Sequence, residues 1–584
     1  PATHLIAGTV LGKAASVVVA VLIALFAGEL VWRERDVRVN EIADAAPAPD
    51  WVFFAGRLLA LILMLAAVQA VLVAAGVLLQ ALQGYHRYEL GLYLRILFGL
   101  KMVDYTLLAI LAMAVHVVVN QKYLGHLIVV FSFVFNQFAA SFGVEHNLLL
   151  YGSDPGWIYS DMNGFGPFVL PWVWFKLYWG AWALLLAVVA RLFWVRGRAP
   201  GGRTAQARSR LTGGAAGAAG VAVLLILTLG GFIFYNTNVL NEYSTGLEAD
   251  APWAEYERRY KRYEGVPQPR ILAAQLRVEI YPDEPAAELR GSYQLVNRTT
   301  QAIDSIHLIV LPQVSARSLS FDRAAERVVD DGDLQYQVYA LDRPLLPGDS
   351  LRLHFDLTIR PRGFPNQGIP TAVVRNGTYF DRRWLPIVGY QPFLELKDAK
   401  TRQDHGLPHR PEFPAPTDAQ ALQHREPFHD AELVDVDMVI GTAADQIAVT
   451  SGTLRREWTE NGRRYFHYRT EAPLPFDAAV LSARYAVRED RWKDVALRIY
   501  HHPTHTFNLD RMVRSMKASL DYNTTSFGPY PFPELRIVEF PLYASGARAH
   551  PHTIAFSEGS AFLTRVEEGD VDRPFFVVAH ETAH

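Results

Sequence analysis

Six long apolar runs before residue 235 constrain the fold of this chain more than any other feature of its sequence. Each run holds about 20 mostly apolar residues, the length that an α-helix needs to cross a bilayer. A soluble protein would need an unusually large core to bury all six. The sequence therefore predicts an α-helical transmembrane bundle with spans at Ala14–Trp32, Leu58–Leu79, Ile96–Val119, Tyr123–Gly143, Phe168–Trp194 and Ala215–Tyr235.

Arginines gather in alternate loops between these spans. The two most basic loops follow the first and the fifth span; their arginines are Arg33, Arg35, Arg38, Arg196, Arg198, Arg203, Arg208 and Arg210. Cytoplasmic loops are enriched in Lys and Arg, so both loops are expected in the cytoplasm. This orientation places the residues after Tyr235 on the extracytoplasmic side of a multi-pass membrane protein.

The third span carries ionisable side chains, which are costly in hydrocarbon and tend to face a partner or water. Lys101 and Asp104 are three residues apart and share one helix face, and His116 lies further along the same span. An internal ion pair explains the first two residues. A path for a transported solute is the alternative.

The overall composition restricts the chemistry available to the chain. Its formal net charge is −3, which gives no sign of nucleic-acid binding. The chain has no cysteine, so disulfides and thiolate ligands are excluded, and a transition metal would be held by histidine and carboxylate. Zn²⁺ on nitrogen and oxygen ligands is compatible with this composition.

Three regions follow the predicted spans. Residues 236–270 contain APWAEYERRYKRYEG, which predicts a juxtamembrane helical linker whose aromatic face docks on the membrane surface or on the next domain. Residues 271–499 alternate apolar and polar positions, as in AQLRVEIYPD and DSLRLHFDLTIR, which predicts an all-β antiparallel domain. Residues 500–584 begin a mixed α/β domain, in which one helix face carries Leu509, Met512, Met516 and Leu520.

The segment FFVVAHETAH carries the pattern with the most specific chemistry. His580 and His584 are four residues apart and therefore share one face of a helix, so both imidazoles can bind one zinc ion. Glu581 then points toward the metal-bound water and can act as its general base. The spacing predicts a zinc site with Glu581 as the catalytic residue.

A catalytic zinc site usually takes three protein ligands. Five earlier histidines, in HHPTH and AHPH, are interpreted as strand-end or loop residues: His501, His502, His505, His550 and His552. The sequence begins at Pro1 and stops on His584, so we expect it to be an excerpt of a longer protein. The third zinc ligand is accordingly expected beyond residue 584.

Residues 271–584 resemble the gluzincin family of aminopeptidase N and leukotriene hydrolase. The resemblance rests on the order of VEIYPD, GSYQLVNRT, LLPGDSLRLHFD, HHPTHTFN, FGPYPFPELRIVE and HETAH. It implies that residues 500–584 are the N-terminal part of a thermolysin-like zinc peptidase domain that acts on peptides. In that family a glutamate ligand and a transition-state tyrosine follow the HExxH motif.

The chain departs from this family at the strand that binds the substrate's amino group. The family's GxMEN motif corresponds to Gly546, Ala547, Arg548, Ala549 and His550, and Ala549 replaces the glutamate. An alanine side chain cannot pair with an ammonium ion, so the resemblance does not extend to exopeptidase specificity. A second amine-anchoring side chain of the family would correspond to Asn376 in NGTYF.

The whole layout resembles bacterial proteins that join an ABC-type permease membrane segment to such a peptidase domain. The resemblance implies a location in the bacterial cytoplasmic (inner) membrane and an ATPase on a separate subunit. The expected function is a membrane-anchored, aminopeptidase N-like zinc metallopeptidase that hydrolyses peptides outside the cytoplasm. The alternatives are an ABC-type permease subunit whose outer domain binds a transported substrate, and a sensor that binds peptides without hydrolysis.

Overall fold

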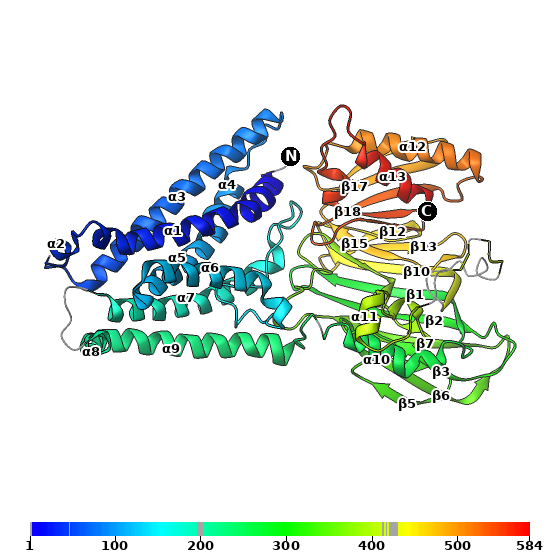
Figure 1. Cartoon of the computed structure of the whole chain (residues 1–584). Helices are drawn as coiled ribbons and strands as arrows, with labels where there is room; N and C mark the ends of the chain where they lie inside the picture. Colours follow the sequence, from blue (N-terminus) through cyan, green and yellow to red (C-terminus); the bar gives the residue numbers. More distant parts are fainter. Residues whose placement is uncertain are drawn as a thin grey trace. The chain divides into compact units, whose positions relative to one another are not determined.

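The computed structural model describes residues 3–45, 47–195, 202–246, 248–410, 414–415, 417–419 and 430–584, so Arg196 and Arg198 of the basic loop lie outside the described part. The chain forms two compact units (Figure 1). The helical unit comprises Pro1–Tyr159, Pro167–Gly246 and Arg362–Ile369. The β-rich unit comprises Ser160–Gly166, Leu247–Pro361 and Pro370–His584.

Six helices of the helical unit are long and apolar enough to span a bilayer, which confirms the predicted membrane-inserted character. They are α1 (Ala15–Asp36), α3 (Asp50–Leu82), α4 through α5 (Leu90–Val119), α6 with the next turn (Lys122–Phe142), α7 with the preceding turn (Gly166–Phe193) and α9 with the next turn (Gly213–Leu240). Two short helices, α2 (Asn40–Ala45) and α8 (Arg203–Arg210), lie between them. Large apolar side chains such as Leu63, Phe131 and Leu227 are exposed on these helices, as expected for surfaces that face lipid.

Three ionisable residues inside the helical unit are paired, whereas His116 is buried and neither of its ring nitrogens has a hydrogen-bond partner among the described residues. Lys101 Nζ lies 3.6 Å from Asp104 Oδ2, which confirms the predicted ion pair. Lys176 on α7 (Val169–Phe193), whose role the sequence did not indicate, contacts Asp104 Oδ1 at 2.7 Å and Asp154 Oδ2 at 2.6 Å. This network compensates the charges that the helices bury.

Most of the β-rich unit is built from three sheets around one apolar core. The largest sheet contains, in spatial order, β12 (Thr453–Glu460), β13 (Arg463–Arg469), β10 (Ala431–Ala443), β1 (Arg270–Tyr281), β2 (Ala286–Val296), β7 (Ser350–Ile359) and β4 (Ser315–Phe321), with β14 (Leu474–Pro475) on β10. A second contains β5 (Ala325–Asp331), β6 (Tyr336–Leu345), β3 (Ile303–Ile309) and β9 (Ile387–Val388). The third contains β11 (Ile447–Val449), β15 (Ala479–Ala483) and β8 (Thr378–Asp381).

The large sheet corrects the expectation that this region is wholly antiparallel. Strands β1 and β10 pair in parallel, with Leu276 opposite Met438. Parallel neighbours need a long crossover connection, and here the chain forms β2 through β9 before it returns to β1 as β10. The other pairs in this sheet are antiparallel, for example β1 with β2 and β2 with β7.

The predicted linker helix is α10 (Ala251–Tyr260), and it docks on the β-rich unit. Its Tyr256 ring stacks on Tyr390 with centroids 5.0 Å apart, and Tyr260 stacks on Tyr336 at 3.9 Å. Both α10 tyrosines are buried. Of the two docking surfaces considered for the linker, the structure supports the neighbouring domain. A further short helix, α11 (Ala399–Asp404), follows the second sheet in the chain.

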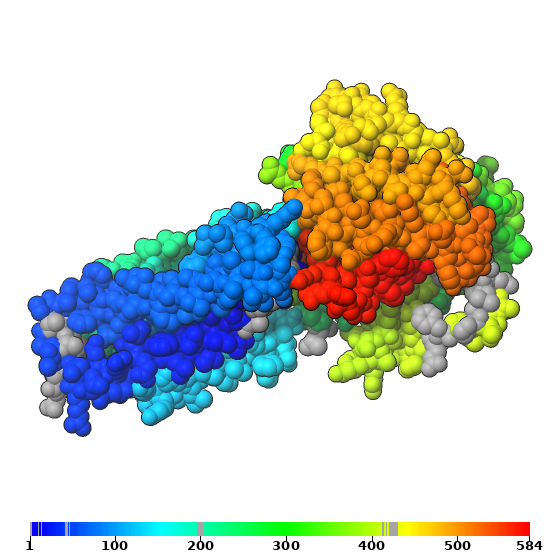
Figure 2. Space-filling model, turned by 90° about the horizontal axis from the view of Figure 1, so that it is seen from above, coloured from blue at the N-terminus to red at the C-terminus, as the bar shows by residue number. Residues whose placement is uncertain are grey.

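A five-stranded sheet with two helices forms the C-terminal part of the β-rich unit. Its spatial order is β16 (Ala486–Trp492), β17 (Val495–His501), β18 (Glu534–Phe540), β20 (Thr553–Ser557) and β19 (Ala547–His550), and the helices are α12 (Leu509–Ser526) and α13 (Arg573–Ala583). Residues 486–499, which we expected in the β domain, therefore belong to this sheet. In Figure 1 α12 and α13 lie side by side, and Figure 2 shows the C-terminal segment in red at the surface.

The apolar face predicted for α12 is buried. Leu509, Met512, Met516 and Leu520 are each at most 7% exposed and pack in a core with strands β17 and β18. Val578 of α13 is fully buried in the same core. This packing fixes the helix that carries the HETAH segment against the sheet.

Candidate functional site

Helix α13 positions the HETAH segment, and local interactions define where it begins. The Asp572 carboxylate caps the helix by accepting a hydrogen bond from the backbone N–H of Phe575 at 3.1 Å. Pro574 occupies the first turn, where a missing N–H costs nothing. Two serines of α12 donate to α13 carbonyls, Ser515 to Phe575 at 2.6 Å and Ser519 to Ala579 at 3.2 Å.

The two predicted metal ligands lie together at the exposed end of α13. His580 Nε2 and His584 Nε2 are 3.2 Å apart. Two nitrogens bound about 2.0–2.1 Å from one tetrahedral zinc ion would be about 3.3 Å apart. The spacing of the two imidazoles, both exposed, therefore fits one shared zinc ion.

Glu581 and His584 line a cleft with a volume of about 590 Å³. Ala549 and His550 of strand β19 contribute to the same lining. The predicted base, one predicted ligand and part of the predicted substrate strand thus border one cavity of the β-rich unit. His580 lies on α13 one helical turn before His584.

Strand β19 is the last strand of the five-stranded sheet and pairs with β20 alone among the described strands. It is preceded by Gly546, whose φ of +91° is accessible to glycine at little cost. The backbone of an edge strand can bind an extended peptide as an additional strand. The open edge of β19 therefore lies beside the cleft.

Asp477 also lines the cleft, and its carboxylate contacts two neighbouring side chains, Arg548 and His550. Its carboxylate lies 3.1 Å from Arg548 Nη2, and its Oδ1 lies 3.4 Å from His550 Nδ1. Burial alone would raise the pKa of Asp477, but the interactions with His550 and Arg548 hold it below the usual value. The side chain of Arg548 therefore points to Asp477 and also lies 3.4 Å from Asp381.

Asn376 is buried and is not among the residues that line the cleft. Its Nδ2 donates to the Met162 carbonyl at 2.7 Å, and its Oδ1 accepts from the backbone N–H of Arg484 at 2.8 Å. The amide thus ties together distant segments of the β-rich unit. Its proposed role in binding an amino group stays a prediction.

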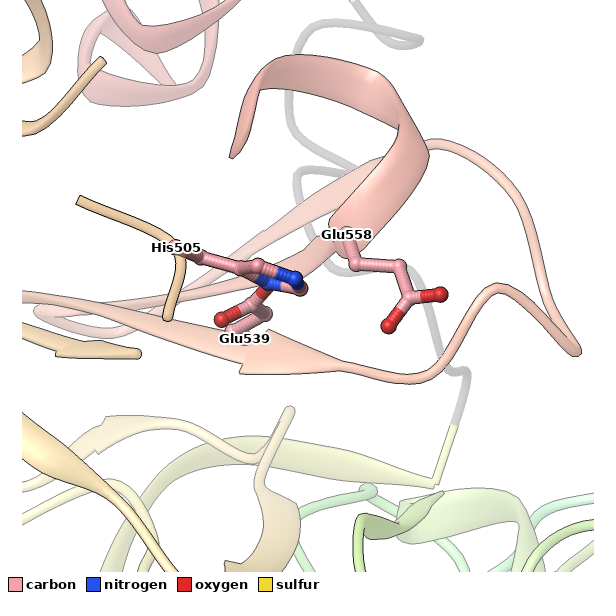
Figure 3. A group of neighbouring side chains, drawn as sticks. All are labelled: His505, Glu539 and Glu558. Carbon is pink, nitrogen blue, oxygen red and sulfur yellow. The ribbon is translucent and has the colours of Figure 1, made fainter. Parts of the chain in front are cut away.

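A second cluster of potential metal ligands, which the sequence reasoning missed, lies elsewhere in the β-rich unit. One ligand atom each of His505, Glu539 and Glu558 lies within 4.8 Å of the others, and all three residues are buried (Figure 3). His505 follows β17, Glu539 lies in β18, and Glu558 directly follows β20. The sequence did hold a signal for this cluster, because acidic residues are rarely buried without a partner. Glu539 lies inside the apolar strand segment RIVEF, and Glu558 directly follows the apolar segment TIAFS.

Hydrogen bonds hold each member of this cluster in place. His505 Nδ1 lies 2.5 Å from Glu539 Oε1, and His505 Nε2 lies 3.2 Å from Asp161 Oδ2. The Ser160 hydroxyl donates to Glu558 Oε2 at 2.9 Å. Burial, together with the charges of Glu539 and Asp161, raises the pKa of Glu558 to about 8.

No family model and no curated protein matches the chain in sequence.

Proposed function

We propose that the chain is a membrane-anchored zinc metallopeptidase whose active site is the cleft beside α13. The observation that carries the proposal is the 3.2 Å approach of His580 Nε2 and His584 Nε2 on a helix whose Glu581 lines that cleft. Two imidazoles at this spacing suit one zinc ion, and a carboxylate on the same helix suits a general base. Zinc-dependent peptide hydrolysis uses both.

His580 and His584 would hold the ion and supply two of the three protein ligands that catalytic zinc usually takes. Bound zinc would lower the pKa of a water molecule and polarise the scissile carbonyl. Glu581 accepts the proton of the attacking water and then donates it to the leaving amine. Strand β19 orients the substrate by pairing with its backbone.

The resemblance to the gluzincin family gives a second line of support. The order of the motifs, from VEIYPD through HETAH, agrees with an aminopeptidase N-like peptidase of thermolysin-like fold. A mixed sheet flanked by α12 and α13 suits such a fold. The same resemblance suggests a peptide as the substrate and Zn²⁺ as the cofactor.

Removal of the metal tests this proposal. Dialysis of the detergent-purified full-length protein against 1,10-phenanthroline is expected to abolish hydrolysis of a fluorogenic peptide, and Zn²⁺ is expected to restore it. A His580→Ala/His584→Ala variant should not be restored, whereas the control His409→Ala, in an exposed loop histidine, should behave as the wild type. Full activity of a preparation that mass spectrometry shows to be free of metal would contradict the proposal.

The cleft does not offer a spare carboxylate for a substrate amino group. Among the described lining residues the acidic side chains are Asp477 and Glu581; Arg548 and His550 pair with Asp477, and Ala549 occupies the position of the family's glutamate. We therefore expect cleavage that does not depend on a free amino terminus.

Acetylation of a peptide's amino terminus tests this expectation. The kcat/KM of the acetylated peptide should stay within about 3-fold of that of the free peptide, because no charge-assisted hydrogen bond is lost. An amine-anchoring site would instead lose about 10- to 150-fold, the value of a hydrogen bond to a charged group. A loss in that range would restore the aminopeptidase interpretation.

The proposed location is the bacterial cytoplasmic membrane, with the β-rich unit on the extracytoplasmic side. The six apolar helices support insertion into a membrane. Arg203, Arg208 and Arg210 in the loop before α9 support a cytoplasmic position for that loop. Helix α9 follows this loop in the chain and spans the bilayer, so the β-rich residues that come after α9 lie on the opposite, extracytoplasmic side.

Transport is a second candidate function, favoured by a cavity of about 270 Å³ inside the helical unit. Its lining includes Lys101, Asp104, Ser132 and Asn136, which are polar residues in otherwise apolar spans. Polar residues in a membrane interior often mark a solute path. An ABC-type permease subunit would require an ATPase on another chain. ATP-dependent uptake of a solute by the complex of the two chains, without peptide hydrolysis, would favour this candidate.

A further inference from the structure

The buried cluster of His505, Glu539 and Glu558 is separate from the cleft at α13. None of the three residues is among those that line the cleft. They gather at the carboxyl ends of β17, β18 and β20, which are neighbouring parallel strands and so end at the same edge of the sheet. In open α/β sheets this edge is where ligands bind.

The charges within the cluster are not balanced by basic side chains. Glu539 and Glu558 are both 0% exposed. Among the described residues no Lys or Arg forms an ion pair with either glutamate, and the imidazole of His505 is their basic neighbour. Buried carboxylates are costly unless a cation, a metal or hydrogen bonds compensate them. Glu539 accepts a hydrogen bond from the backbone N–H of His502, and Glu558 accepts one from Ser160 Oγ and one from the backbone N–H of Asp161. Two carboxylates whose basic neighbour is one imidazole also favour an additional cation.

The donor atoms lie close enough to share one metal ion. Ligand atoms 2.0–2.4 Å from one ion lie no more than about 4.8 Å apart, and the three donors meet this limit. A bound ion would replace the proton of the 2.5 Å hydrogen bond between His505 Nδ1 and Glu539 Oε1. Asp161 lies 3.2 Å from His505 Nε2, so it can accept the proton of that nitrogen and leave Nδ1 to face Glu539. Metal-binding histidines commonly donate their second N–H to a carboxylate in this way.

We propose that His505, Glu539 and Glu558 bind a divalent first-row metal ion, Zn²⁺ or Mn²⁺, at a second site of the β-rich unit. One imidazole with two carboxylates is a donor set suited to these ions. The site joins strand ends β17, β18 and β20 to the segment Ser160–Gly166, because Ser160 hydrogen-bonds Glu558 and Asp161 pairs with His505. Its role is structural: it holds this segment on the sheet.

The test is the metal content of the full chain, purified in detergent without an affinity tag of histidines. It uses a His580→Ala/His584→Ala background, which removes any ion held at the cleft. After loading with Zn²⁺ or Mn²⁺ separately and gel filtration, mass spectrometry should find about one equivalent of one of these ions per chain. When Glu539→Gln and Glu558→Gln are added to this background, the metal content should fall below about 0.2 equivalent per chain.

The matched control is Glu489→Gln on β16, an exposed glutamate that pairs with Arg498, and it should leave the metal content unchanged. Circular dichroism shows whether each variant is folded. If the double glutamine variant is unfolded, a His505→Gln variant replaces it. Less than about 0.2 equivalent in the background chain, or unchanged content in a folded cluster variant, would overturn the proposal. Neither outcome bears on the proposed peptide hydrolysis. That proposal is tested separately, by the activity of the protein with His580, Glu581 and His584 intact.

Discussion

A Glu581→Gln variant is expected to lose peptide hydrolysis by about 10²- to 10⁴-fold in kcat, the usual contribution of a positioned general base. Glutamine keeps the size of the side chain but cannot accept the proton of the attacking water. Because His580 and His584 remain in place, the variant should keep its bound zinc. The measurement is steady-state hydrolysis of a fluorogenic peptide, made beside the metal content of the same preparation.

The matched control is Glu568→Gln. Glu568 is exposed, and it lies in the loop that precedes α13, so its substitution should change kcat by less than about 2-fold. Equal activity of the wild type and Glu581→Gln would remove Glu581 from the mechanism. Loss of zinc together with activity would instead mean that the substitution disturbs the metal site, and Glu581→Asp would then be needed to separate the two effects.

A Glu257→Ala variant is expected to lower the free energy of unfolding of the β-rich unit by about 3–5 kcal/mol. Glu257 on α10 accepts two hydrogen bonds from Arg402, each 2.7 Å long, and the two side chains are 2% and 3% exposed. Removing the carboxylate leaves a guanidinium buried without this partner, which costs more than the intact pair contributes. The thermal unfolding midpoint should fall by roughly 5–10 °C.

Glu255→Ala on the same helix is the control for this prediction. Glu255 pairs with Arg258 and Arg259 at the surface, where ion pairs contribute about 0–1 kcal/mol. Its substitution should shift the midpoint by less than about 2 °C. Equal shifts for the two variants would show that α10 is not anchored through the buried pair.

The transmembrane helices could be predicted because each apolar run is a local signal. Their ends were less predictable. Helix α3 begins at Asp50 rather than at Leu58, since the segment before the apolar run continues the helix and Arg57 forms a 2.6 Å ion pair with Glu34 of α1. The contact with α1 accompanies this longer helix, and it leaves no periodic trace in the sequence.

Strands were recognisable from their alternation, but their partners were not. The alternation in AQLRVEIY shows that β1 has one buried face, as the structure confirms for Leu276, Val278 and Ile280. It carries no information on β10, which is far along the chain and pairs with β1 in parallel. The place of β16 and β17 in the five-stranded sheet was missed for the same reason.

The two candidate sites differ in how far the sequence reveals them. His580, Glu581 and His584 lie within one helical turn, so spacing alone places them together. His505, Glu539 and Glu558 meet because three parallel strands end at one sheet edge. Their proximity follows from strand pairing, and an isolated sequence does not encode that pairing in any local pattern.

Anomalous X-ray diffraction at the zinc edge, from crystals of the zinc-loaded full-length protein, tests the pairing of His580 and His584 on one ion most directly. We expect an anomalous peak about 2.0–2.1 Å from Nε2 of each histidine. A fully loaded crystal without a peak between these two nitrogens would contradict the proposal that this helix holds a catalytic metal.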